Sequence, residues 1–153
     1  MRLTTRTNLA MRALMFCAVN DDRIVRKHEI AVGCNASENH LAQVVNTLAQ
    51  QGFVETHRGR SGGLRLARPP EAISVGAVFR AFETGSPFAE CFEPDSNTCP
   101  LTATCRLRVA LAAALESFYA ALDRISLRDL VEDNTGLETI LRLHDNRRQR
   151  LCA

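Results

Sequence analysis

The chain has 153 residues and a net charge of +2, with 46% hydrophobic and 24% charged residues, a composition typical of one globular domain that can bury a core. No apolar run approaches the roughly 18 residues of a membrane span, and the stretch from Leu9 to Val19 is interrupted by Arg12 and lacks a signal-peptide cleavage site. We therefore expect a cytoplasmic protein without a membrane partner, in which six cysteines indicate metal binding or redox chemistry rather than disulfides.

The first predicted elements are helices. Threonines near the start offer N-caps for a helix that reaches about Val19, and Arg26–Val32 forms one or two further helical turns. A tight turn at 33–36 leads to Ser37, a favourable N-cap for a helix that ends before Gly52. Two helices joined by a short turn predict a helix-turn-helix.

In such a motif the second helix enters the major groove of DNA with its first residues toward the base edges. The apolar stripe of this helix points inward, which leaves the opposite face free to contact the DNA bases. The stripe consists of Leu41, Val44, Val45 and Leu48. Asparagine and glutamine pair with adenine, and glutamate accepts from cytosine. Candidate DNA-binding residues are Ser37, Glu38, Asn39, His40 and Gln43. Each could instead be an ordinary solvated helix residue.

A hairpin follows this helix. Residues 53–56 and 64–67 are short strand-like runs around a glycine-rich tip that carries Arg58 and Arg60. These arginines could contact phosphate or enter a minor groove. The order of helices and hairpin predicts a winged helix-turn-helix, and the charge distribution agrees: eleven basic and six acidic residues precede residue 81, against eight and eleven after it. A solvated surface would show the same bias.

Beyond a helix that starts after Ser74, three cysteines fall within fifteen residues, with seven and then five residues between them: Cys91, Cys99 and Cys105. Thiolates are soft ligands for iron–sulfur clusters, zinc or cuprous copper, and structural zinc favours closer pairs than these. The polar loop around them is a poor setting for inert core thiols. Cys17 and Cys34, in apolar or helical surroundings, are predicted to be structural, and Cys152 is unassigned.

The longest helical pattern runs from Pro100 or Thr102 to Leu122. A helix of about twenty residues and about 30 Å is hard to cover within so small a domain, so its apolar stripe predicts a dimer; packing within one chain is the alternative. Shorter helices are expected at Ser126–Val131 and Thr135–Leu143, followed by a disordered tail at 144–153.

The fold class is therefore mainly α, a winged helix-turn-helix with a long C-terminal dimerisation helix. We divide the chain into a DNA-binding domain (1–84), a cysteine loop (85–106), dimerisation helices (107–143) and the tail. Neither a Cys-x-x-Cys pair nor an evident base supports an enzyme. A regulator whose cysteines sense oxidants directly, through disulfides or zinc, remains an alternative.

Four stretches together resemble the iron–sulfur winged-helix regulators of the NsrR, RirA and IscR type. They are the start of the first helix (1–4), the glycine-rich hairpin tip (58–64), residues 73–78, and the cysteine loop with Arg106 and Arg108 after it. The resemblance covers residues 1 to about 143 and is greatest toward the NsrR and RirA types.

This resemblance implies a homodimeric repressor that binds double-stranded operator DNA and responds to nitric oxide. Cys91, Cys99 and Cys105 would hold one labile cluster per subunit, of the 4Fe-4S type, able to convert to 3Fe-4S or 2Fe-2S. NsrR-type proteins can take a fourth ligand from a carboxylate in the first helix of the other subunit, where this chain has Asn8. An amide is a poor iron ligand, and in this respect the chain resembles the iron-responsive RirA branch. The substitutes that remain open for the fourth ligand are Glu90, Glu93, Asp95, water or a small thiol.

Overall fold

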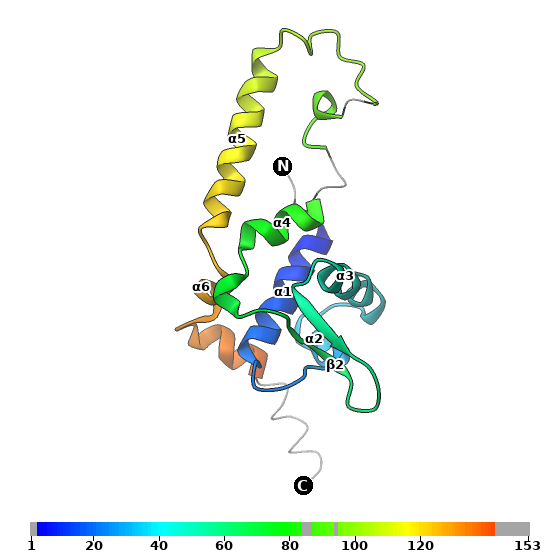
Figure 1. The fold of residues 1–153 in the computed structure, drawn as a ribbon, viewed down its shortest axis with the longest axis vertical. Helices are drawn as coiled ribbons and strands as arrows, with labels where there is room; N and C mark the ends of the chain where they lie inside the picture. Colours follow the sequence, from blue (N-terminus) through cyan, green and yellow to red (C-terminus); the bar gives the residue numbers. More distant parts are fainter. Residues whose placement is uncertain (1–2, 84–86, 94, 143–153) are drawn as a thin grey trace.

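The computed structural model describes residues 3–83, 87–93 and 95–142. A mainly helical head carries one hairpin, and a long helix rises away from the head and meets a returning loop (Figure 1). The elements in chain order are α1 (Thr5–Val19), α2 (Lys27–Gly33), α3 (Glu38–Gln50), β1 (Val54–His57), β2 (Gly63–Leu66), η1 (Pro70–Ala72), α4 (Val75–Glu83), η2 (Glu90–Phe92), α5 (Arg106–Asp123) and α6 (Leu127–Val131). The mainly α class with a winged helix-turn-helix is confirmed.

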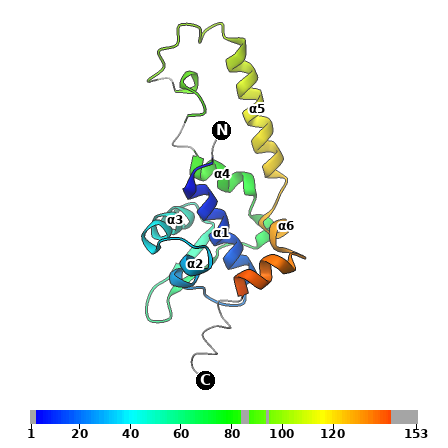
Figure 2. The ribbon, with the colours of Figure 1, turned by 180° about the vertical axis from the view of Figure 1, so that it is seen from behind.

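Helix α1 is the centre of the head. Thr4 caps it by accepting a 3.2 Å hydrogen bond from the Thr7 amide. The helix is buried on several sides, because α3, α4 and α6 all pack against it. Leu14 and Phe16 are fully buried there. Figure 2 shows α1 passing between α3 and α6 from behind.

The helix-turn-helix forms where the sequence predicts it. Asn35 takes a left-handed conformation (φ 49°) in the turn, which asparagine tolerates better than most residues. The Ser37 hydroxyl then accepts a 3.2 Å hydrogen bond from the His40 amide and caps α3. The predicted apolar stripe of α3 is buried against the head. After the helix, Gly52 adopts φ 70°, so the chain can reverse into the hairpin.

The hairpin is antiparallel, with Val54 opposite Leu66 and His57 opposite Gly63. Backbone hydrogen bonds of 2.9 and 2.8 Å also join Leu64 to Val25, so that the base of the wing is attached to the segment before α2. These bonds fix the wing at its base. At the tip, Gly59 has φ 103°, a conformation that residues with a side chain rarely adopt.

Replacing Gly63 with alanine should loosen this attachment. A Cβ atom at Gly63 would lie 2.3 Å from the Val25 carbonyl oxygen, so the bridge between the two segments would have to shift. We expect a loss of about 1–3 kcal/mol in the free energy of unfolding, the range for overpacked sites, measured by urea denaturation. Alanine at Gly136, where the nearest atom would be 3.9 Å away, is the control. Equal stability of the two variants would contradict the close approach.

Helix α5 begins at Arg106, so the predicted start at Pro100 or Thr102 is wrong. The Thr102 hydroxyl donates a 2.8 Å hydrogen bond to the Cys99 carbonyl, which holds this stretch in turns. Such local bonds compete with helix formation. Cys105 is the N-cap, and its Sγ accepts from the Arg108 amide at 3.4 Å.

After α5 the chain returns to the head. Ser126 and Asp129 form the predicted capping box of α6, and residues 135–142 are helical. Leu127 and Leu141 are buried in the head core. The predicted tail at 144–153, including Cys152, lies outside the described residues. Within the described ranges, no helix is long and apolar enough to cross a membrane.

Candidate functional site

The outer face of α3 presents most of the predicted reading residues to solvent. Glu38, Asn39 and Gln43 are exposed, and His40 is half-buried. The Ser37 hydroxyl is occupied as the cap of α3. Glu38 is also engaged, since its Oε1 lies 2.8 Å from Nδ1 of His28 at the start of α2. Asn39 and Gln43 are thus the amides of this group best placed to meet base edges.

The head carries further basic residues that sequence reasoning did not single out. Arg26 and Lys27 are exposed at the start of α2, the helix that crosses the DNA backbone in such motifs. Arg6 of α1 donates a 3.3 Å hydrogen bond to Thr47 of α3. The Arg26-Lys27-His28 run was visible in the sequence, whereas the approach of Arg6 to α3 depends on tertiary packing.

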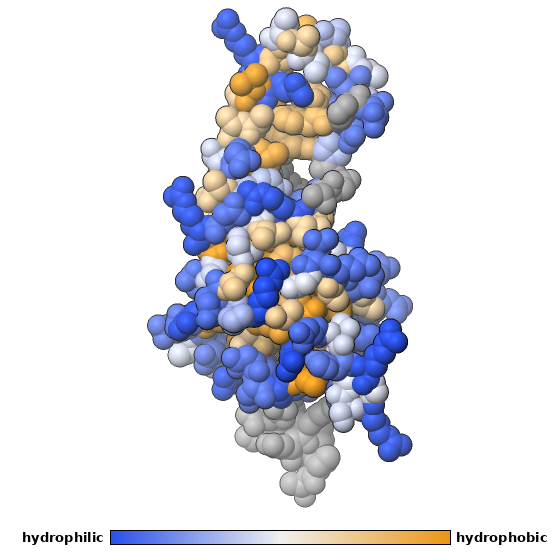
Figure 3. Space-filling view, viewed as in Figure 1, coloured by the Kyte–Doolittle hydropathy of each residue, from blue (hydrophilic) through white to orange (hydrophobic). Residues whose placement is uncertain are grey.

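Both predicted wing residues, Arg58 and Arg60, are exposed at the hairpin tip. The neighbouring Arg65 is already paired with Glu55, at 3.1 Å. In the space-filling view, hydrophilic side chains dominate the visible face of the head and the wing. Apolar surface gathers higher up, along α5 and the cysteine loop, which together we call the arm (Figure 3). The head and the arm therefore suit different kinds of partner.

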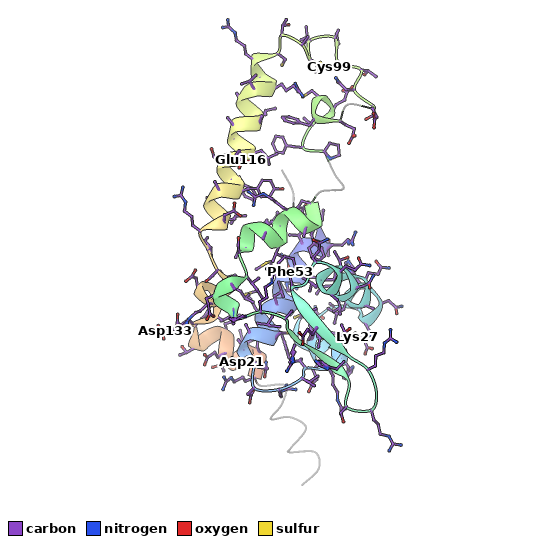
Figure 4. The ribbon with its side chains drawn as sticks, in the orientation of Figure 1. Asp21, Lys27, Phe53, Cys99, Glu116 and Asp133 are labelled. Carbon is purple, nitrogen blue, oxygen red and sulfur yellow. The ribbon has the colours of Figure 1, made fainter. Side chains whose placement is uncertain are left out.

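The cysteines fall into two environments. Cys17 and Cys34 are buried, and burial raises the pKa of Cys17 to about 12 and that of Cys34 to about 11. They are inert thiols of the core, as predicted. Cys91, Cys99 and Cys105 are only half-buried. Figure 4 places Cys99 in the loop at the far end of α5, remote from Lys27 in the head.

Two sets of contacts organise the described part of the cysteine loop, residues 87–93 and 95–106. Glu90 accepts hydrogen bonds of 2.7 Å from both the amide and the hydroxyl of Thr98, beside Cys99. Those bonds hold the pKa of Glu90 below its ordinary value. The Arg108 side chain donates a 2.9 Å bond from Nε to the Cys91 carbonyl.

The donor set suits an iron–sulfur cluster by chemistry and access. Three soft sulfur ligands stand on one polar, half-exposed loop, and the Arg108 amide at the start of α5 donates to the Cys105 sulfur. Among the described residues no three His, Cys, Asp or Glu side chains lie close enough to hold a metal ion. A cluster held by all three cysteines would require the loop to bring their thiols closer together. The Glu90 carboxylate, which belongs to the loop, already accepts a hydrogen bond from Thr98.

Asn8, the predicted fourth-ligand position, is exposed on α1. It lines a groove of about 380 Å³ between the start of α1 and the turn before α3, together with Arg12 and His40. The groove contains no carboxylate. The chain thus presents an amide where an NsrR-type protein can present an acid.

Two groups of polar contacts join α4 to its neighbours, one to α5 and the other to α1. Arg80 of α4 forms a bidentate pair with Asp123 at the end of α5, at 2.6 and 2.8 Å, and stacks 4.7 Å from the Tyr119 ring centroid. Glu83, the last residue of α4, accepts from the Thr4 amide at 3.0 Å and from the hydroxyls of Thr4 and Thr7. Helix α4 is thereby linked to the end of α5 through Arg80 and to the start of α1 through Glu83.

Glu83 should stabilise the head in a pH-dependent manner. Burial raises its pKa, but the hydrogen bonds from Thr7 and Thr4 outweigh this and hold the pKa below the ordinary 4.5. The stabilisation is therefore present above pH 4.5 and is lost as the pH falls through the lower folded-state pKa. We expect E83Q to cost about 1 kcal/mol at neutral pH, and the difference from wild type to shrink below pH 4.5. Chemical denaturation between pH 3 and 7 measures it.

The control is E138Q, since the Glu138 side chain forms no hydrogen bond or ion pair with the described residues. It should follow wild type at every pH. A constant gap between E83Q and wild type down to pH 3 would contradict the role of the Glu83 charge.

Helix α5 is largely uncovered. None of its eighteen residues is buried, and the apolar Leu107 and Val109 are 66% and 70% exposed. Only its second half touches the head, where Phe118 contacts Phe79 with ring centroids 6.2 Å apart. An apolar helix left this bare is typical of an interaction surface.

Comparison with known proteins agrees with this architecture. The chain is 43% identical over 143 residues to the HTH-type transcriptional regulator NsrR of Geobacillus kaustophilus, covering 93% of this chain and 97% of the relative. Among solved structures it is similar to T. potens IscR (TM-score 0.67, 25% identity, 87% and 88% covered). It is also similar to CymR, the global cysteine regulator of B. subtilis (TM-score 0.63, 26% identity, 86% and 96% covered).

The model of the Rrf2 family, described as an iron-dependent transcriptional regulator, matches residues 3–133. That range includes the helix-turn-helix, the wing, the cysteine loop and α5. The chain is therefore a transcriptional regulator that belongs to the Rrf2 family.

Proposed function

We propose that the chain is a repressor that binds operator DNA as a homodimer and holds an iron–sulfur cluster through which it responds to nitric oxide. The observation that carries the proposal is the separation of its cysteines: three half-exposed thiols lie on one loop, while the two others described are buried in the core. The similarity to an NsrR of 43% identity supports the same reading.

DNA binding is assigned to α3 and the wing. Asn39 and Gln43 would meet base edges in the major groove, with His28 holding Glu38 beside them. Arg58 and Arg60 would contact phosphate or the minor groove. Because one head reads only half of a two-fold site, a dimer is required for a full operator.

The dimer is assigned to α5. A second copy of the chain would cover Leu107 and Val109, which one subunit leaves in water. This assignment keeps the division proposed from the sequence: a reading head, a cysteine loop and a dimerisation helix.

We assign Cys91, Cys99 and Cys105 as the ligands. A bound cluster would supply iron that reacts with nitric oxide and is lost when iron is scarce. The chain's own residues would then convert cluster binding by the loop into a fixed spacing of the two heads. With the three thiolates held together, the loop is fixed between the end of α4 and the start of α5, and the Arg80–Asp123 pair carries that spacing to the head.

With the thiols released, the loop keeps only exposed contacts within itself and to the start of α5, such as those of Glu90 and Arg108. The loop then relaxes, and the two heads lose their fixed spacing. To move an operator from nearly full to nearly empty, the two states need differ by only about 5 kcal/mol in DNA affinity.

A second candidate function is iron sensing of the RirA type, and Asn8 is the observation that favours it. Without a carboxylate at this position, one iron would lack a protein ligand and would leave readily under iron starvation. A third candidate is a cluster-free thiol or zinc sensor. The thiol sensor is supported by the separation of the three thiols, since the described residues contain no ready-made metal-binding group; a zinc sensor would need the thiols to come together as a cluster does.

Operator binding separates these candidates. DNA is first selected from a random pool by the anaerobically purified protein, and its affinity is then measured after separate additions of nitric oxide, an iron chelator and a thiol oxidant. Release by nitric oxide supports the proposal, and release by the chelator alone supports iron sensing. Release by the oxidant alone, from protein that contains no iron, supports a thiol sensor.

A further inference from the structure

Arg108, in the first turn of α5, touches two of the three cysteine segments. Its backbone amide donates to Cys105 Sγ at 3.4 Å, and its side-chain Nε donates to the Cys91 carbonyl at 2.9 Å. Its guanidinium also lies 5.8 Å from the ring centroid of Phe92. Phe92 in turn meets Phe88 edge-on, at 6.2 Å between centroids.

These contacts bridge a large gap in the chain. Seventeen residues separate Cys91 from Arg108, and without a bond between them the two segments would be related only through the loop itself. The Glu90–Thr98 bonds join the Cys91 turn to the residue before Cys99. Arg108 therefore completes a frame that connects all three cysteine segments before any metal is present.

We propose that Arg108 is the positioning residue of the cysteine loop, which holds the Cys91 segment against the start of α5 and thereby slows the loss of the cluster. The inference rests on the proposed function, because it assigns a role toward the cluster of that same site. A planar guanidinium suits this role, since it can donate to a carbonyl and stack on a ring at once. Partners that orient metal ligands typically change metal affinity by ten- to a hundredfold.

The chain provides a matched control two residues away. Arg106 carries the same charge in the same helical turn and is exposed, yet it makes no hydrogen bond, ion pair or ring contact with the described residues. R106Q removes one positive charge near the loop without removing the bridge. R108K retains the charge and a donor but lacks the planar group.

The test compares wild type, R108Q, R108K and R106Q as full-length protein purified without air. The first measurement is the rate at which the visible absorbance decays after a chelator is added. We expect R108Q to lose its absorbance about tenfold faster than wild type, R106Q to match wild type, and R108K to recover part of the difference. Wild-type decay in R108Q, or equal acceleration in R106Q, would overturn the proposal.

The second measurement uses the metal-free protein and does not depend on the cluster. Amide hydrogen exchange of residues 88–93 should be faster in R108Q than in R106Q, with exchange in the head unchanged. Equal exchange of this segment in R108Q and R106Q would show that Arg108 does not hold the Cys91 segment in place. Wild-type protein that contains no iron would instead reject the proposed function and the cluster role together, and the exchange result would then stand as a test of the bridge alone.

Discussion

Replacing Cys99 with alanine is expected to abolish the visible absorbance and the bound iron of the anaerobically purified protein. Two thiolates and a remote amide cannot replace a ligand set of three soft sulfur atoms. The variant should remain folded, because Cys99 is half-buried in a loop outside the head core. We expect its free energy of unfolding to stay within about 0.5 kcal/mol of the metal-free wild type.

Cys34 supplies the control for this experiment. It is a buried thiol whose pKa is raised to about 11, and it lies in the head. C34A should keep its iron content and absorbance, although it removes the same chemical group. Full cluster content in C99A, or equal loss in both variants, would refute the ligand assignment.

The double variant R58A/R60A is expected to weaken operator binding by roughly tenfold or more at fixed salt, through lost phosphate contacts. The loss should be nearly independent of sequence, since phosphates carry no base information. If each arginine neutralises one phosphate, the slope of the logarithm of the binding constant against that of the salt concentration should fall by about 2. Titrations at several salt concentrations give both quantities.

Its control is R124A/R128A, which removes the same charge from the end of α5 and from α6, away from the wing (Figure 1). That variant should retain the wild-type salt slope. An unchanged slope in R58A/R60A would place the wing outside the DNA interface.

Much of the head could be predicted from sequence because its signals are local. Ser37 and Gly52 mark the ends of α3 by capping chemistry, and the hairpin follows from two strand-like runs around glycines. The start of α5 could not be predicted in the same way. In the structure, bonds such as those from the Thr102 hydroxyl to the Cys99 carbonyl and from the Thr104 amide to the Leu101 carbonyl hold this stretch in turns, and the helix begins only at Arg106.

In the candidate site, too, some features follow from local sequence signals and others only from the fold. Three cysteines at close spacing identify the loop, and a capped amphipathic helix identifies the reading face. The contacts that organise them join residues far apart in sequence: Arg108 to Cys91, and Arg80 to Asp123. Neither pair carries a local pattern, so both required the fold. The half-burial that separates Cys91 from Cys17 is likewise a property of packing rather than of sequence neighbours.

Cluster binding by the three thiols of the cysteine loop would determine whether the two heads grip DNA. Its most direct test is the content of iron and acid-labile sulfide in protein isolated without air. The account predicts both elements bound to each subunit, and their loss in C99A. Wild-type protein that contains neither, and that takes up neither on reconstitution, would contradict it.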